Sequence, residues 1–279
     1  YQVLIVTLWR AEEEFPLPAK LRRINLGDLP VRAGGRFALA LQRFLSFRKS
    51  IKTFAPDIVI SFCNKANFRS AFAMAGMKTP LLTSVRNDPE KDYRPYKAAC
   101  WWMEKKASGC VFQTRQAKEF FSKNFQKRSR IIWNPVDEKY LAARQKRQSG
   151  GKEERQRSNH IVSVGRISKQ KNHLLLLKAF SRIMDKFPAA KVQIYGEDCE
   201  MQVRVELDQY IEQMKMNEKV EFMGQRDNLE DVIGDAALFV MPSDYEGMPN
   251  ALAEAMTLGL PVIATDCPCK GPAALIEDG

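Results

Sequence analysis

Several features that mark membrane-spanning, exported or disulfide-rich proteins are missing from this chain of 279 residues. No apolar run approaches the roughly 20 residues that a membrane-spanning helix needs, and the N-terminus lacks the basic segment and apolar stretch of a signal peptide. The six cysteines form no C-x-x-C pair, which argues against a zinc site or a thioredoxin-type motif. We therefore expect a globular, cytoplasmic protein with reduced thiols.

Metal-binding side chains are also scarce. Histidine occurs only at His160 and His173, and no D-x-D sequence is present. Cys267 and Cys269 are the closest cysteine pair, but no further ligands cluster beside them in the sequence. The sequence therefore predicts no metal site.

Charge is distributed unevenly along the chain. Residues 1–157 carry 32 Lys and Arg against 14 Asp and Glu, whereas residues 158–279 carry 12 against 19. A basic half implies an anionic partner, either a nucleic acid or the phospholipid face of a membrane. The alternative is a solvated surface that only keeps the protein in solution.

Short β-rich apolar runs alternate with longer stretches of helical period in both halves. The runs 57–62 and 80–85, for example, flank the helical stretch 67–77, and the same order resumes at residue 160. Such alternation is typical of a parallel sheet covered by helices. The sequence predicts an α/β fold with two Rossmann-like, doubly wound parallel-sheet domains.

Residues 142–159 interrupt this alternation. They have almost no apolar content, a Gly-Gly pair and dense mixed charge, which favours a linker or mobile surface loop. The predicted domains are therefore residues 1–141 and residues 160–279. In doubly wound sheets, ligands bind at the carboxyl ends of strands, where loops meet helix N-termini.

One such loop follows the predicted strand 160–164. Gly165 and Arg166 stand at its carboxyl end, and Lys171 and Asn172 begin the next helix. Helix amides and cationic side chains both favour an anion in this position. The loop is a candidate diphosphate cradle, and the alternative is a surface loop with ordinary basic residues.

A second loop follows the predicted strand 237–241. Glu246 lies in this loop, and Glu254 falls about one and a half turns into the next helix, roughly 7 to 8 Å along its axis. Two carboxylates so placed can hold separate hydroxyl groups of an elongated ligand. They could instead form a glycosidase acid/base pair, or Glu254 could be a solvent-facing helix residue. The neighbouring diphosphate cradle favours a sugar nucleotide.

Together these residues resemble the donor-binding domain of retaining GT-B glycosyltransferases of family 4. Within residues 158–279 the matching motifs are Gly165-Arg166-Ile167-x-x-x-Lys171-Asn172, Phe222-x-Gly224, and Ser243-x-x-Glu246-Gly247-x-Pro249-Asn250-x-x-x-Glu254-Ala255-Met256-x-x-Gly259-x-Pro261-Val262-Ile263. The first half resembles the acceptor domain more loosely, through Pro56-Asp57-Ile58-Val59, Arg86-Asn87-Asp88-Pro89, Phe112-Gln113-Thr114 and Asn134-Pro135-Val136-Asp137.

The resemblance implies roles for individual residues. Arg166 and Lys171 would bind the donor diphosphate, Glu254 the ribose hydroxyls, and Glu246 the transferred sugar near the reacting carbon. The implied catalytic residues are Glu246, Arg166 and Lys171. The implied donor-binding residues are Gly165, Arg166, Lys171, Gly224, Glu246, Gly247, Met248, Asn250 and Glu254. Family members often carry a histidine in the first domain, and this chain has none there; Arg86 or Asn87, after the predicted strand 80–85, would face the cleft on the acceptor side instead.

The resemblance also implies a reaction that needs no cofactor and no metal ion. In this family the leaving phosphate itself is thought to help deprotonate the acceptor, and the cationic side chains stabilise the leaving diphosphate. UDP is the commonest donor nucleotide. Compared with the family, the chain is expected to lack the first β-α unit and the C-terminal end, so that both domains are incomplete.

The leading hypothesis is thus a retaining glycosyltransferase that moves a sugar from a nucleotide diphosphate, most often UDP, to a lipid-linked or polysaccharide acceptor. Its basic half would lie against anionic lipid, at the inner face of the plasma membrane. The alternative is a nucleotide-sugar-binding protein without catalytic activity. A nucleic-acid binder is suggested by charge alone, with no supporting motif, and we expect no nucleic-acid partner.

Overall fold

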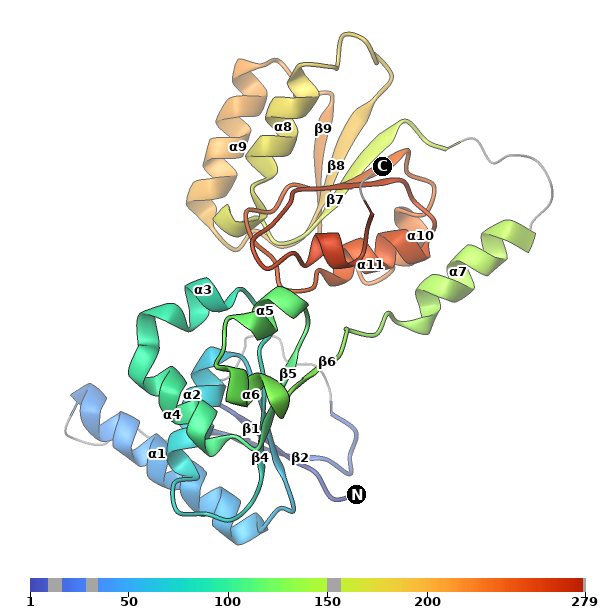
Figure 1. The fold of residues 1–279 in the computed structure, drawn as a ribbon. Coiled ribbons are helices and arrows are strands. Elements are labelled where there is room, and N and C mark those ends of the chain that lie inside the picture. The colour runs from blue at the N-terminus through green and yellow to red at the C-terminus, as the bar shows by residue number, and fades with distance from the viewer. Residues whose placement is uncertain (10–16, 29–34, 150–156, 278–279) are drawn as a thin grey trace. The chain divides into compact units, whose positions relative to one another are not determined.

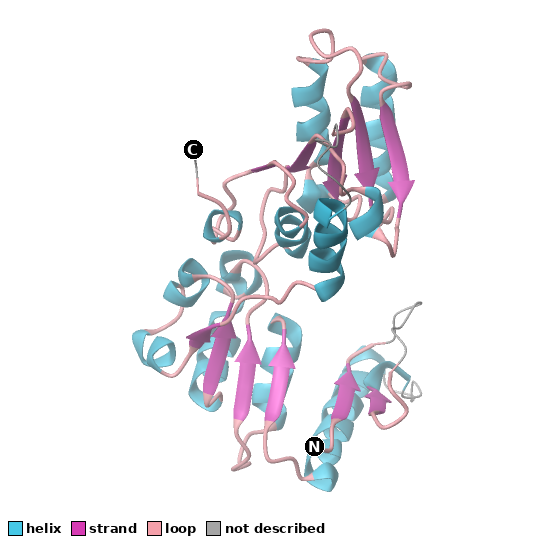
Figure 2. Ribbon diagram, turned by 90° about the vertical axis from the view of Figure 1, so that its right-hand side faces the viewer, coloured by secondary structure: helices cyan, strands magenta, loops and turns pink. Residues whose placement is uncertain are grey.

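The computed structural model describes residues 1–9, 17–28, 35–149 and 157–277. It divides into two compact units (Figure 1). The first comprises Tyr1–Phe112 and Ala117–Ile131, and the second comprises Gln113–Gln116 and Ile132–Gly279. Every strand pair in the described residues is parallel (Figure 2), which confirms the predicted α/β class.

The first unit contains two parallel sheets. A two-stranded sheet pairs β1 with β2, and a four-stranded sheet has the order β3-β4-β5-β6. The strands are β1 Leu4–Thr7, β2 Arg22–Asn25, β3 Val59–Phe62, β4 Leu81–Ser84, β5 Gly109–Phe112 and β6 Arg130–Ile131. The helices are η1 Leu26–Asp28, α1 Gly35–Phe54, α2 Asn64–Ala73, α3 Pro89–Asp92, η2 Arg94–Tyr96, α4 Lys97–Lys106, α5 Arg115–Glu119, which continues from the second unit, and α6 Lys123–Lys127.

Two local features of this unit were not predicted from the sequence. The segment after β5 forms two short helices, α5 and α6, because the Ser122 side chain accepts a hydrogen bond from the Phe125 amide and starts α6 afresh. The strand β2 was not predicted, since its sequence RRIN gives only a weak apolar signal.

The second unit is built on one five-stranded sheet with the order β11-β10-β7-β8-β9. The strands are β7 His160–Val164, β8 Lys191–Tyr195, β9 Val220–Gly224, β10 Leu238–Met241 and β11 Val262–Ala264. The helices are α7 Glu138–Ser149, η3 Lys169–Lys171, α8 His173–Ser181, α9 Met201–Gln213, α10 Leu229–Val232, α11 Asn250–Thr257 and η4 Pro272–Ala274.

Both faces of this sheet are buried. Ile161 of β7 packs with the residues of α8 and α9, whereas its neighbour Val162 packs with those of α11. Figure 1 shows α8 and α9 along one side of the strands. Side chains of a strand alternate between its faces, so adjacent apolar residues are needed where helices cover both. This is the doubly wound arrangement that the sequence predicts.

The loop expected over residues 142–159 is wrong for residues 142–149, which belong to α7. Residues 150–156 lie outside the described part. The helix is attached mainly through polar contacts, which apolar periodicity in the sequence does not reveal. Arg147 donates to the carbonyls of Glu230 and Asp231 in α10 and pairs with Asp235, and Tyr140 is the buried apolar anchor.

Replacing Arg147 with Met should lower the free energy of unfolding by about 1–3 kcal/mol, because the helix carbonyls lose their donor. Chemical denaturation measures the change. Lys146→Met is the matched control, since Lys146 is exposed on the same helix and makes no such contact among the described residues. Equal stabilities for the two variants would contradict this attachment of α7.

Candidate functional site

The sheet of the second unit brings the two predicted loops together. Strands β7 and β10 are parallel neighbours, with Ile161 opposite Leu238 and Val162 opposite Phe239. Their carboxyl ends therefore lie at the same edge of the sheet, where doubly wound proteins bind ligands. The loop after β7 carries Lys171, and the loop after β10 carries Glu246.

These two side chains form an ion pair. Lys171 Nζ lies 2.6 Å from Glu246 Oε1. Glu246 is only 7% exposed, so its charge is largely removed from water and depends on the lysine. The sequence predicted both residues as part of the site but did not predict that they contact each other.

Gly165 makes room for this lysine. A Cβ atom at Gly165 would lie 3.0 Å from Cε of Lys171, closer than such contacts normally come. The lysine stem therefore lies directly over the glycine. Gly196, at the end of β8, allows a second close approach, since its Cβ would clash with the carbonyl of Gly165 and its φ is +152°. The sequence reasoning did not single out Gly196.

Further hydrogen bonds hold the two loops to each other. Asn172 Nδ2 donates to Asp244 Oδ1 at 2.7 Å, and Gln170 Nε2 donates to the Tyr245 carbonyl at 2.9 Å. The amide of Asp244 donates to the Gln170 carbonyl at 2.9 Å. Asn172 also caps α8 from a left-handed conformation, with φ of 45°. Lys171 thus lies between two residues that are fixed to the Glu246 loop.

Arg166 follows the carboxyl end of β7, and Gly224 is the last residue of β9. Both therefore lie at the edge of the sheet where the carboxyl ends of its parallel strands meet. Arg166 is exposed and makes no hydrogen bond or ion pair within the described ranges, so its guanidinium is available to an anion. Gly224 ends β9 with φ of +67°, a conformation that other residues rarely adopt. The predicted donor-binding roles of both residues stay predictions.

Glu254 is half-buried in α11 and does not point freely into solvent. Burial raises the pKa of its carboxyl, and a hydrogen bond from Tyr140 and the charge of Lys139 partly oppose this increase. Asp137 and Glu230 raise the pKa further. The carboxylate is thus surrounded by residues from α7 and α10, a setting that the sequence alone did not indicate.

Met248 and Asn250 already have partners in this structure. The amide of Met248 donates to Gln113 Oε1 at 3.2 Å, and Asn134 Nδ2 donates to Asn250 Oδ1 at 2.5 Å. Gln113 and Asn134 were noted in the sequence only as parts of loosely matching motifs. Gln113 directly follows β5 and Asn134 comes three residues after the end of β6, and these positions beyond strand ends were the signal that could have marked them.

Arg86 and Asn87 lie in the first unit, two and three residues after the end of β4. The Arg86 guanidinium lies 6.0 Å from the centroid of the Phe62 ring, and Asp88 caps the short helix α3 by accepting from the amide of Glu90. This places both residues at the carboxyl end of a strand, as predicted. Their acceptor-side role stays a prediction.

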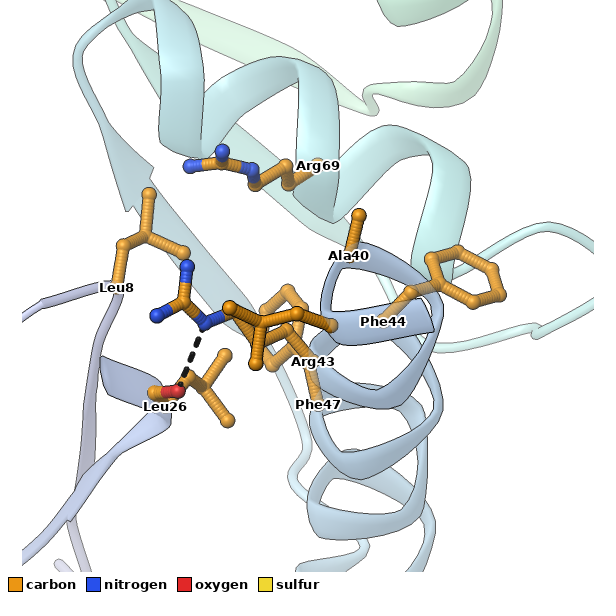
Figure 3. Close-up of a pocket in the computed structure, with 8 residues that line it drawn as sticks. Leu8, Leu26, Ala40, Arg43, Phe44, Phe47 and Arg69 are labelled. Atoms are coloured by element: carbon orange, nitrogen blue, oxygen red, sulfur yellow. Dashed lines mark hydrogen bonds between the residues drawn. The ribbon is translucent and has the colours of Figure 1, made fainter. Parts of the chain in front are cut away.

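The first unit also contains a cavity of about 240 Å³ that the sequence did not indicate (Figure 3). Its walls are mostly apolar, and Arg43 and Arg69 approach it from α1 and α2. Arg43 Nε donates to the Leu26 carbonyl at 3.1 Å. Burial and the nearby charge of Arg43 lower the pKa of Arg69. The cavity thus combines apolar walls with two cations.

The described residues contain neither a metal-binding cluster nor a membrane-spanning helix. No group of three or more His, Cys, Asp or Glu side chains there is arranged to hold a metal ion. Within the same ranges, no helix combines the length and apolar character needed to cross a bilayer.

Comparison with known proteins identifies the class. The structure is similar to that of Anabaena HepE, solved in complex with UDP and glucose, with a TM-score of 0.74, 19% identity and coverage of 93% of this chain and 70% of that one. It is also similar to S. aureus TarM, with a TM-score of 0.67, 20% identity and coverage of 85% of this chain and 47% of that one. The parallel sheets and these neighbours define a GT-B glycosyltransferase fold.

The family follows from the sequence matches. Residues 1–140 match the family described as Glycosyltransferase Family 4, and residues 158–279 match the one described as Glycosyl transferases group 1. The chain therefore belongs to the group 1/family 4 glycosyltransferases.

Curated relatives agree with this assignment. An uncharacterized glycosyltransferase of Methanocaldococcus jannaschii is 26% identical over 81% of this chain and 60% of its own length. A Campylobacter jejuni enzyme named as an N-acetylgalactosamine-N,N'-diacetylbacillosaminyl-diphospho-undecaprenol 4-alpha-N-acetylgalactosaminyltransferase is 26% identical over 80% and 61%. The chain thus spans about three fifths of the length of the curated relatives it matches.

Removing the Tyr140 hydroxyl should raise the pKa of Glu254, because the hydrogen bond from Tyr140 lowers it in the intact protein. We expect the Glu254 carboxyl of Tyr140→Phe to titrate at higher pH than in the parent, measured by NMR of its carboxyl carbon. Tyr195→Phe is the control, since the Tyr195 hydroxyl donates instead to Gln193.

The sign of the stability effect follows from the same shift. A carboxyl whose pKa is raised by folding stabilises the folded state at low pH, and this contribution is lost as pH rises through the folded pKa. In Tyr140→Phe, the loss of this stabilising contribution should continue to higher pH than in the parent. An unchanged Glu254 titration in Tyr140→Phe would contradict the assigned hydrogen bond.

Proposed function

We propose that the second unit binds a nucleotide diphosphate sugar and that the whole enzyme transfers the sugar to an acceptor with retention of anomeric configuration. The observation that carries this proposal is the largely buried Lys171–Glu246 pair at the shared edge of β7 and β10. A largely buried cation beside a buried carboxylate suits a ligand that has a diphosphate next to a sugar.

Each side chain has a chemical task in this proposal. Lys171 has three N–H donors, so it can keep its bond to Glu246 and still donate to a phosphate oxygen. Arg166, which is exposed, adds a planar fork of donors for a second phosphate oxygen. Charge develops on the diphosphate as the glycosidic bond breaks, and the two cations would stabilise it. Glu246 would hold the sugar hydroxyls beside the reacting carbon.

Glu254 would accept hydrogen bonds from the ribose hydroxyls at the other end of the donor. The carboxyl group of Glu254 offers both oxygens as acceptors only when it is ionised, so its raised pKa bears directly on donor binding. The two glutamates thus act at opposite ends of one ligand. In this arrangement the cations provide the charge stabilisation, and no cofactor or metal ion takes part.

The acceptor and the nucleotide are proposed by analogy. The Campylobacter relatives are named for acceptors linked to diphospho-undecaprenol, and solved neighbours such as HepE hold UDP. We propose a UDP-sugar donor and a lipid-linked or polysaccharide acceptor. The basic first half would then contact anionic lipid at the cytoplasmic face of the membrane.

The first test is calorimetry of the chain with UDP and a series of UDP-sugars. We expect micromolar binding that weakens about tenfold to a hundredfold in Arg166→Ala and Glu254→Ala, since each loses hydrogen bonds that involve a charge. Lys178→Ala and Glu206→Ala are matched controls on α8 and α9, because both side chains are exposed and outside the proposed site.

Catalysis is tested separately from binding. Glu246→Gln should keep UDP binding and lose donor hydrolysis and sugar transfer. Parent protein that binds donor but neither hydrolyses nor transfers it would favour the alternative of a binding protein without catalysis. A parent that binds no nucleotide, or variants that bind as well as the parent, would refute the proposed donor site.

A further inference from the structure

A chain of hydrogen bonds joins four residues of the second unit around the start of α11. The backbone N–H of Met248 donates to Gln113 Oε1 at 3.2 Å. Gln113 Nε2 donates to Asn134 Oδ1 at 2.8 Å, and Asn134 Nδ2 donates to Asn250 Oδ1 at 2.5 Å. The series of hydrogen bonds therefore starts at Met248, in the loop that carries Glu246, and ends two residues later at Asn250, the first residue of α11.

The direction of every bond in this chain is fixed by its first member. A backbone N–H can only donate, so the oxygen of Gln113 must face it and the Gln113 amino group must face Asn134. That amino group can only donate, which turns the Asn134 oxygen toward it and the Asn134 amino group toward Asn250. The Asn250 oxygen is thereby used, and its amino group remains as a donor at an exposed position.

The inner end of the chain is buried. Gln113 is 3% exposed and Met248 is 6% exposed, so water does not readily replace a lost partner there. A second contact supports the same arrangement, because the amide of Asn134 lies 3.4 Å from Met248 Sδ. The backbone N–H of Met248 is therefore already hydrogen-bonded to Gln113 before a sugar nucleotide binds.

We propose that Gln113 and Asn134 are positioning residues. They determine which hydrogen-bond donors at residues 246–250 are available to the transferred sugar. Gln113 occupies the backbone N–H of Met248, so that this group cannot donate to the sugar. Asn134 occupies the side-chain oxygen of Asn250, so that the amino group of Asn250 can donate to the sugar. This inference rests on the proposed function, and it alters the role predicted for Met248. It implies that the two residues affect recognition of the sugar and leave recognition of the nucleotide unchanged.

Two isosteric changes interrupt the chain at successive links. Gln113→Glu still accepts from the Met248 amide but cannot donate to Asn134. Asn134→Asp still accepts from Gln113 but cannot donate to Asn250. Either change releases the orientation of Asn250 while leaving the size of the side chain unaltered. Gln116→Glu is the charge-matched control, since Gln116 is exposed three residues further on.

The measurement is the ratio of the dissociation constant of UDP to that of the best-binding UDP-sugar, by calorimetry, for the parent and each variant. We expect the ratio to fall about three- to tenfold in Gln113→Glu and in Asn134→Asp, as the loss of a neutral hydrogen bond implies. UDP alone should bind both variants as it binds the parent. The ratio for Gln116→Glu should equal that of the parent.

A ratio that is unchanged in both variants would overturn the proposal. Equal weakening of UDP and UDP-sugar, together with a lower melting temperature, would also overturn it, because the chain would then only stabilise the fold. A parent that binds neither ligand would instead refute the proposed function, and the inference with it.

Discussion

The parallel pairing of β7 with β10 is the constraint on which the candidate site depends. These strands are far apart in the sequence, yet their carboxyl ends are adjacent, and Lys171 meets Glu246 only for that reason. A shift of one residue in the register of β10 would turn its apolar side chains to the opposite face of the sheet. The two-sided core of the second unit therefore also fixes the geometry of the ion pair.

The largely buried pair constrains its surroundings in turn. Charges held apart from water need close, well-oriented partners. The backbone of neighbouring segments therefore has to approach Lys171 and the Glu246 loop closely. Gly165 lies under the lysine stem, Gly196 lies against Gly165, and a Cβ at Gly271 would meet the carbonyl of Gly247. The glycines thus serve close packing between loops, and the loops are ordered before a donor binds, which reduces the entropy cost of binding.

The sequence was sufficient for the parts of this design that depend on local pattern. Alternating apolar runs predicted the doubly wound sheets, and motif spacing located Lys171 and Glu246, but their contact depends on strand order, which no local pattern encodes. The helix α7 was missed because Arg147 attaches it through carbonyls of another helix. Gln113 was missed because its partner is a backbone amide 135 residues away, and every residue has such an amide.

The charge distribution explains why affinity for an anionic ligand in the second unit has to come from the local geometry of a few side chains. Residues 158–279 carry more acidic than basic side chains, so the long-range field of this half repels the anionic donor that we propose for it. Salt screens such fields beyond about 8 Å at physiological ionic strength, while contacts at hydrogen-bond distance are screened much less. Affinity for a diphosphate must then come from a few cations at contact distance. A lysine held in place by Glu246 meets that requirement, because its position does not depend on the ligand.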